Sequence, residues 1–119
     1  MRKYDDKELL DFIFEFMDEM SEHLSFTGDK NGFFTNKTVR EACIRTLHKI
    51  SETTQKLSDN LKKEISEVEW RKISAMRNVL VHEYLEGIID NNIVFESITV
   101  NIPELKKILE KYYKQKFTN

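Results

Sequence analysis

The sequence has few of the Cys residues that form disulfides or bind metals, and few of the Gly and Pro residues that form turns. It contains one Cys, one Pro and three Gly among 119 residues. A single Cys cannot form an internal disulfide or share a metal with a second Cys, which agrees with a reducing compartment. β-rich domains of this size usually need more Gly and Pro for their turns. The composition therefore favours a soluble helical protein, and we expect a cytoplasmic location.

Two further absences limit the partners of the chain. No run of about 18 apolar residues occurs, so no membrane-spanning helix and no membrane contact are predicted. Lys and Arg number 19 against 21 Asp and Glu, a net charge of -2. The chain thus lacks the basic excess that drives non-specific binding to nucleic acid, and any such contact must be local. Its length suits one domain with its own core, which we predict over residues 1–119.

The sequence does have a strong helical periodicity. Apolar residues recur at helical spacing in residues 5–24, 36–58 and from 70 onward, which predicts three helices, the third ending near Gly87 or at the turn of residues 90–92. Residues 93–100 keep a four-residue spacing but are rich in β-branched side chains, so a short strand is the competing prediction. Pro103 fits the first turn of a final helix. The pattern as a whole predicts an all-α helix bundle.

The segments between these helices are polar. Residues 25–32 hold two of the three Gly and show no periodicity, which predicts a loop, and residues 59–64 are predicted as a polar connection. Ser66-Glu67-Val68-Glu69 matches a capping box, with Ile65 and Trp70 beside it as a hydrophobic staple. We therefore expect the third helix to begin at this box.

The stretch from Arg77 to Tyr84 places an Arg, a His and a Tyr in the most apolar part of the chain. On a helical wheel at about 100° per residue, Arg77 and Tyr84 share a face, and Asn78 and His82 flank it. The neighbours of Arg77 on the wheel are apolar, so this face is predicted to point away from water. Such polar groups either satisfy one another inside a bundle or build a site.

This stretch resembles the HepT-like branch of the HEPN superfamily. The resemblance rests on Arg77-Asn78-x-Leu80-x-His82-x-Tyr84, on Trp70 before it, and on Asp90, Ile93-Val94 and Ile102-Pro103-Glu104-Leu105 after it. It covers nearly the whole chain and is densest from Trp70 to Leu105. One departure is Val94-Phe95, which stands where many relatives have a Trp.

The resemblance implies an antiparallel bundle of four to five helices that dimerises and brings two Arg-x4-His motifs to a shared cleft. It also implies a ribonuclease toxin of a type VII toxin–antitoxin pair, neutralised by a small nucleotidyltransferase antitoxin that adds AMP to the motif Tyr. Arg77 and His82 would then be catalytic, Asn78 would support them, and Tyr84 would be the modification site. No metal or other cofactor is expected.

The residue types suit metal-independent cleavage of RNA. In that reaction the ribose 2′-hydroxyl is the nucleophile, so the protein must move a proton near neutral pH and hold the phosphate with a fixed cation. His82 can supply the first group and Arg77 the second, about 7.5 Å apart along the helix axis. The motif of one protomer offers one imidazole, whereas two copies across a dimer would offer a base and an acid.

The remaining candidates have simpler explanations. His23 and His48 lie on separate helices without Cys or clustered carboxylates at ligand spacing, so helix packing or solvent exposure is predicted rather than a metal site. Cys43 occupies an apolar helix position and is predicted to be a core residue. Four cations of the second helix fit either an RNA groove or a solvated face: Lys37, Arg40, Arg45 and Lys49.

Two alternatives to a ribonuclease remain open. The first is a non-enzymatic HEPN module that binds a nucleotidyltransferase and serves as its substrate or regulatory partner. The second is a structural bundle without a site, in which Arg77, His82 and Tyr84 satisfy one another and nearby backbone groups.

Overall fold

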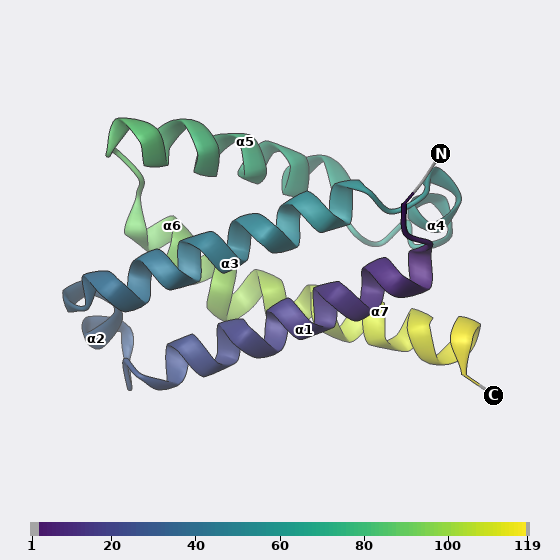
Figure 1. Cartoon of the computed structure of the whole chain (residues 1–119), viewed down its shortest axis with the longest axis horizontal. Helices are drawn as coiled ribbons and strands as arrows, with labels where there is room; N and C mark the ends of the chain where they lie inside the picture. Colours follow the sequence, from purple (N-terminus) through teal and green to yellow (C-terminus); the bar gives the residue numbers. More distant parts are fainter. Residues whose placement is uncertain (1–2, 119) are drawn as a thin grey trace.

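The computed structural model describes residues 3–118, which form helices joined by short connections (Figure 1). The elements are α1 (Asp6–Ser25), α2 (Lys30–Thr35), α3 (Lys37–Gln55), α4 (Asp59–Glu64), α5 (Trp70–Glu86), α6 (Asn91–Glu96), the π-helix η1 (Ser97–Asn101) and α7 (Ile102–Phe117). The described residues contain no strand, so the all-α prediction is confirmed and the alternative of a strand at residues 93–100 is wrong.

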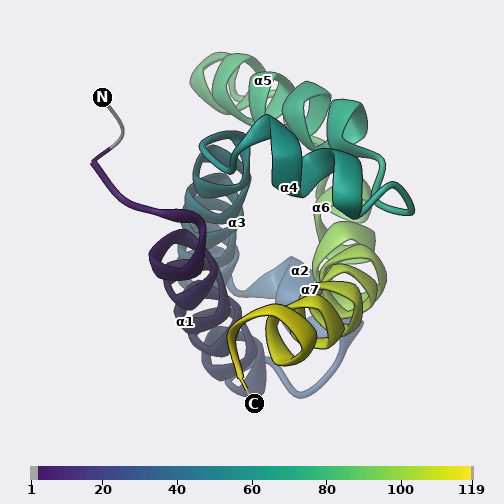
Figure 2. The same ribbon diagram turned by 90° about the vertical axis from the view of Figure 1, so that its right-hand side faces the viewer.

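The four long helices alternate in direction, as in the predicted antiparallel bundle (Figure 1). Helix α3 packs against α1 on one side and against α5 on the other, and α7 packs against α1. Seen along the bundle, the helices surround a central core (Figure 2). None of the helices within residues 3–118 combines the length and apolarity that crossing a bilayer requires.

Helix α1 shows how local sequence and packing agree in this core. Its N-terminus is a capping box, in which the Glu8 N–H donates to the Asp5 carboxylate and the Asp5 N–H donates to the Glu8 carboxylate. Its apolar positions then repeat every three or four residues and are buried against α3 and α7: Leu9, Leu10, Ile13, Met17 and Met20.

The loop predicted at residues 25–32 is helical at its end, because α2 begins inside it. The Asp29 carboxylate accepts from the Gly32 N–H and caps this helix. A Cβ at Gly32 would lie 1.9 Å from the Thr27 carbonyl oxygen, so only Gly fits here. Phe33 is fully buried and fixes α2 to the core. A helix of six residues is too short to show a periodicity in the sequence.

The polar connection predicted at residues 59–64 is also a helix, α4. Ser58 caps it by accepting from the Leu61 N–H, and the Ser58 N–H and hydroxyl both donate to the Asp6 carboxylate at 2.9 and 2.6 Å. Leu61 is buried. The helix therefore forms because one apolar anchor and a cap tied to α1 compensate for its short, polar sequence.

The capping box predicted at residues 66–69 is wrong. Helix α5 begins at Trp70, and its N-cap Glu69 makes no side-chain capping hydrogen bond. The start of α5 is fixed instead by the Trp70 indole N–H, which lies 3.1 Å from the carbonyl oxygens of both Lys62 and Ile65. These carbonyls lie at the C-terminal end of α4, where backbone acceptors lack partners within the helix.

Candidate functional site

Helix α5 carries all four predicted site residues and lies on the outside of the bundle (Figure 1). Leu80 is its only buried residue, at 4% exposure. The prediction that the shared face of Arg77 and Tyr84 points away from water is therefore only partly correct. Arg77 is half-buried against α3, but Tyr84 is 47% exposed.

Arg77 is held by a carboxylate that the sequence did not point to. Its Nε donates to Glu52 Oε1 at 2.6 Å, its Nη2 lies 2.5 Å from the same oxygen, and its Nη1 donates to Asn78 Oδ1 at 3.2 Å. Glu52 lies on α3, 25 residues away in sequence. The guanidinium is thus fixed between the two helices, and one N–H on each of Nη1 and Nη2 remains available to a ligand.

His48 extends this group along α3. Its Nε2 lies 3.3 Å from Glu52 Oε1, without the alignment of a hydrogen bond. That nitrogen is covered from solvent and has no hydrogen-bond partner among residues 3–118. His48 was expected to serve packing or to face solvent, whereas the structure places its imidazole beside Glu52, the carboxylate that holds Arg77. The spacing of His48 and Glu52 is the only signal in the sequence, since residues four apart share a helix face.

His82 is exposed and lies apart from this group. It lies about 140° around α5 from Arg77 by helix geometry, and it makes no hydrogen bond or ion pair with any residue that the structure describes. The structure therefore brings Asn78 to Arg77 but leaves His82 free for a partner outside the protomer.

Tyr84 lines a pocket of about 270 Å³ between α3 and α5. The α3 wall consists of Glu41, Ile44, Arg45 and His48, and the α5 wall consists of Leu80, Val81, Tyr84 and Leu85. A larger hollow of about 500 Å³, between the start of α5, η1 and α7, includes none of the four predicted site residues. The pocket that contains Tyr84 therefore adjoins the Arg77 group through His48.

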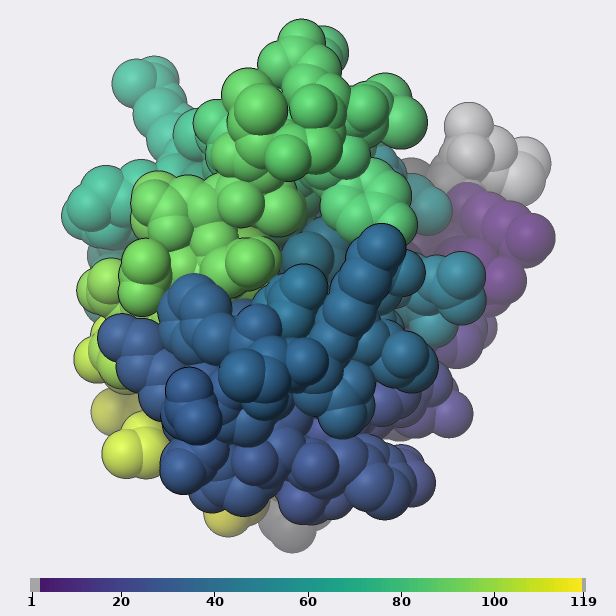
Figure 3. Space-filling view, turned by 90° about the vertical axis from the view of Figure 1, so that its left-hand side faces the viewer, coloured from purple at the N-terminus to yellow at the C-terminus, as the bar shows by residue number. Residues whose placement is uncertain are grey.

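Large apolar side chains are exposed near the end of α5. Leu85 and Ile88 continue the apolar spacing of α5, but they are 79% and 63% exposed, and Ile93 on α6 is 57% exposed. Figure 3 faces this end of the molecule, where the atoms of the α5 end and of α6 rise above those of α2 and α3. These side chains leave apolar surface exposed at this end of the molecule.

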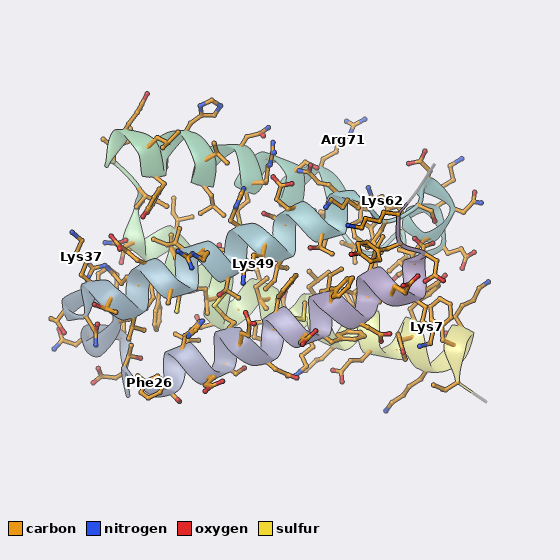
Figure 4. All side chains as sticks on the ribbon, in the orientation of Figure 1. Lys7, Phe26, Lys37, Lys49, Lys62 and Arg71 are labelled. Atoms are coloured by element: carbon orange, nitrogen blue, oxygen red, sulfur yellow. The ribbon has the colours of Figure 1, made fainter. Side chains whose placement is uncertain are left out.

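The four cations that fitted either an RNA groove or a solvated face divide into two groups. Lys49 pairs with Glu19 at 3.6 Å, and Arg40 donates to the Phe34 carbonyl at 2.6 Å, so both serve the fold. Lys37 and Arg45 are exposed, and neither makes an ion pair within the described part of the chain. Figure 4 shows how far apart Lys37 and Lys49 lie along α3. Arg45 alone among the four lies beside Tyr84.

Cys43 confirms the prediction of a core residue. Its side chain is fully buried, and this burial raises the pKa of the thiol to about 11. The thiolate is therefore not formed near neutral pH, which excludes Cys43 as a nucleophile there.

Comparisons with known proteins find a family whose profile spans most of the chain. The profile of the family described as "Ribonuclease HepT-like" matches residues 10–112. A protein of Methanocaldococcus jannaschii named as an RNase is 31% identical over 116 residues, which cover 96% of this chain and 92% of that protein. "Probable ribonuclease HepT" of Thermococcus cleftensis is 28% identical over 100 residues, 84% of this chain and 86% of that protein. Both names give the activity as inferred. No solved structure matches the chain.

Proposed function

Because this chain belongs to the HepT-like ribonuclease family, as its motif predicted, we propose that it is a metal-independent endoribonuclease that cleaves RNA. The observation that carries the proposal is the state of Arg77. Its guanidinium is fixed by Glu52 and Asn78, yet its side chain remains 35% exposed and keeps free N–H groups. A cation held in place at the surface is suited to bind the scissile phosphate without reorganisation.

The proposed reaction requires two proton transfers. One imidazole takes the proton of the ribose 2′-hydroxyl as its oxygen attacks phosphorus, and a second acid protonates the departing 5′-oxygen, so the bond to that oxygen breaks and a 2′,3′-cyclic phosphate forms. His82 is exposed and unpartnered within residues 3–118, so it is free to take part. Arg77 would neutralise the charge that develops on the non-bridging oxygens.

We place the second His82 in a second copy of the chain. The exposed side chains of Leu85 and Ile88 give the end of α5 an apolar surface that a second copy would cover. In such a homodimer, His82 of each protomer would reach the cleft that holds the two Arg77 guanidinium groups. The composite site supplies a base and an acid where one motif has a single imidazole.

Tyr84 is the proposed site of control. Its side chain is 47% exposed, so its hydroxyl is open to a nucleotidyltransferase antitoxin. Attack of that hydroxyl on the α-phosphorus of ATP would form a phosphodiester with AMP and release pyrophosphate. The added nucleotide would put bulk and negative charge into the groove between α3 and α5 and would compete for Arg77. In this scheme the chain is the toxin of a toxin–antitoxin pair.

A second candidate is a non-enzymatic partner of the nucleotidyltransferase. The observation that favours it is the ion pair of Arg77 with Glu52, which already compensates the charge that catalysis would use. In this case Tyr84 would still accept AMP, but the chain would not cleave RNA.

Incubation of the purified protein with RNA in EDTA separates the two candidates. Wild type should cleave, and His82→Ala should lose about 10²–10⁴-fold in rate while keeping its fold, because the side chain is exposed. Lys72→Ala removes an exposed cation of the same helix and is the matched control. No cleavage by any clean wild-type preparation would favour the binding partner.

A mass measurement after incubation with the co-encoded nucleotidyltransferase and ATP tests the control step. AMP adducts should form on wild type and disappear in Tyr84→Phe. Adducts that persist in Tyr84→Phe would place the acceptor at another residue.

A further inference from the structure

The pocket beside Tyr84 has the lining of a binding site for a flat, partly polar ring. Its floor is apolar, since Ile44 and Leu80 are only 7% and 4% exposed. The Tyr84 ring is half exposed at its α5 wall. Aromatic side chains at the mouth of an apolar pocket are the usual stacking partners of unpaired RNA bases.

The pocket also lies in line with the phosphate-binding group. Arg77 and Tyr84 share a face of α5 about two helical turns apart, and His48 and Glu52 are one turn apart on the facing side of α3. His48 belongs to both groups, because it lines the pocket and contacts the carboxylate that holds Arg77. An RNA strand bound at Arg77 would therefore run directly past the pocket.

We propose that this pocket holds an unpaired nucleobase next to the scissile phosphate and selects a base that carries an exocyclic amino group. The proposal rests on the proposed function, because it takes RNA as the ligand of Arg77. Glu41 lines the pocket and makes no hydrogen bond or ion pair in the described part of the chain, so its carboxylate is free to accept from an amino group. Adenine, cytosine and guanine carry such a group, whereas uracil does not.

Two further groups fit the same ligand. Arg45 lies one turn from Glu41, is exposed and has no ion-pair partner within residues 3–118, so its cation is available to the nucleotide's own phosphate. His48 lines the pocket, and its covered Nε2 makes no hydrogen bond with any of residues 3–118, although it lies 3.3 Å from Glu52 Oε1. A purely apolar occupant, such as a side chain of a second copy, would leave Glu41 and Arg45 unused.

Titration of the isotope-labelled full chain with AMP, CMP, GMP and UMP, followed by NMR, tests the proposal without any cleavage. The backbone amides of residues 41–48 and 80–85 should shift, with UMP binding about tenfold more weakly than the other three, the value of one charge-assisted hydrogen bond. Glu41→Ala should reduce AMP, CMP and GMP to the level of UMP and leave UMP unchanged. Glu15→Ala, which removes an exposed carboxylate from α1, is the control.

Three results would overturn the proposal: shifts that are equal for all four nucleotides, shifts that avoid the pocket, or pocket amides that respond only to protein concentration. The last would mean that a second copy fills the pocket. The outcome is separate from that of the cleavage assay. Selective nucleotide binding by a chain that leaves RNA intact would reject the proposed ribonuclease and keep the pocket, and cleavage without selective binding would do the reverse.

Discussion

Helices α1 and α5 both pack against α3, on opposite sides, but they are built for different purposes. Helix α1 buries five apolar side chains and begins at a complete capping box. Helix α5 is nearly as long but buries one side chain and has no side-chain cap. Polar contacts hold it at two points. The Trp70 indole N–H donates to a carbonyl of α4, and the Arg77 guanidinium donates to the Glu52 carboxylate of α3. The difference shows that α1 contributes more to the core than α5, whereas α5 leaves most of its surface exposed.

The largest loss of stability should come from a substitution in the buried face of α1. Leu10 is fully buried, so Leu10→Ala should lower the free energy of unfolding by about 2–5 kcal/mol through lost burial and the cavity left behind. Leu85→Ala, on α5, should change it by less than about 0.5 kcal/mol, because Leu85 is 79% exposed. Urea unfolding measures both. Equal losses would mean that α5 is covered in the protein as it exists in solution.

The attachment of α5 to α4 should be the next most sensitive point. Trp70→Phe keeps an aromatic ring but removes the indole N–H, which serves two carbonyl oxygens, so a loss of about 1 kcal/mol is expected. The loss should be local, and hydrogen exchange should be faster in the first turns of α5 but unchanged in α1. Faster exchange throughout the chain would show that α5 and the core unfold as one unit.

Glu52→Gln tests whether Glu52 positions Arg77 for cleavage or only stabilises the attachment of α5 to α3. The pair is about one-third exposed on both sides, so its loss should cost no more than about 1 kcal/mol. The loss of transition-state stabilisation in cleavage should be larger than this loss of folding stability, because an unfixed Arg77 would lose its orientation toward the phosphate. The decrease should appear in kcat. An increase in cleavage would instead show that Glu52 restrains Arg77.

The smallest effect on folding stability at neutral pH is expected from the thiol of Cys43, on the buried face of α3. Burial raises the pKa of its thiol from 9.0 to about 11, so the folded chain keeps this proton where the unfolded chain loses it. Stability should therefore be unaffected below pH 9 and should fall as the pH rises from about 9 to about 11. Unfolding curves from about pH 9 to 10 check the slope, and Cys43→Ala should remove it there, because Tyr112, whose pKa is raised from 10.0 to about 12, contributes only at higher pH. Alkylation of the native thiol at pH 8 would show that the core opens.

The sequence by itself determined the four long helices and the motif that they carry. Apolar spacing is a local property, and so is the position of Arg77, Asn78, His82 and Tyr84 along one helix. Apolar spacing did not predict α2 and α4, because helices of six residues form only where a cap and one buried side chain fix them to the core.

Only the tertiary structure decided what surrounds Arg77. Glu52 reaches it, with His48 one turn away on the same helix, because α3 and α5 pack side by side. The spacing within α3 brings His48 to Glu52, but no spacing within either helix encodes the contact of Glu52 with Arg77. The same packing left Leu85 and Ile88 exposed, although their periodicity resembles that of the buried face of α1. Periodicity shows which side chains share a face, but burial requires a neighbour to cover that face. Within residues 3–118, no neighbour covers Leu85 and Ile88 at the end of α5 enough to bury them.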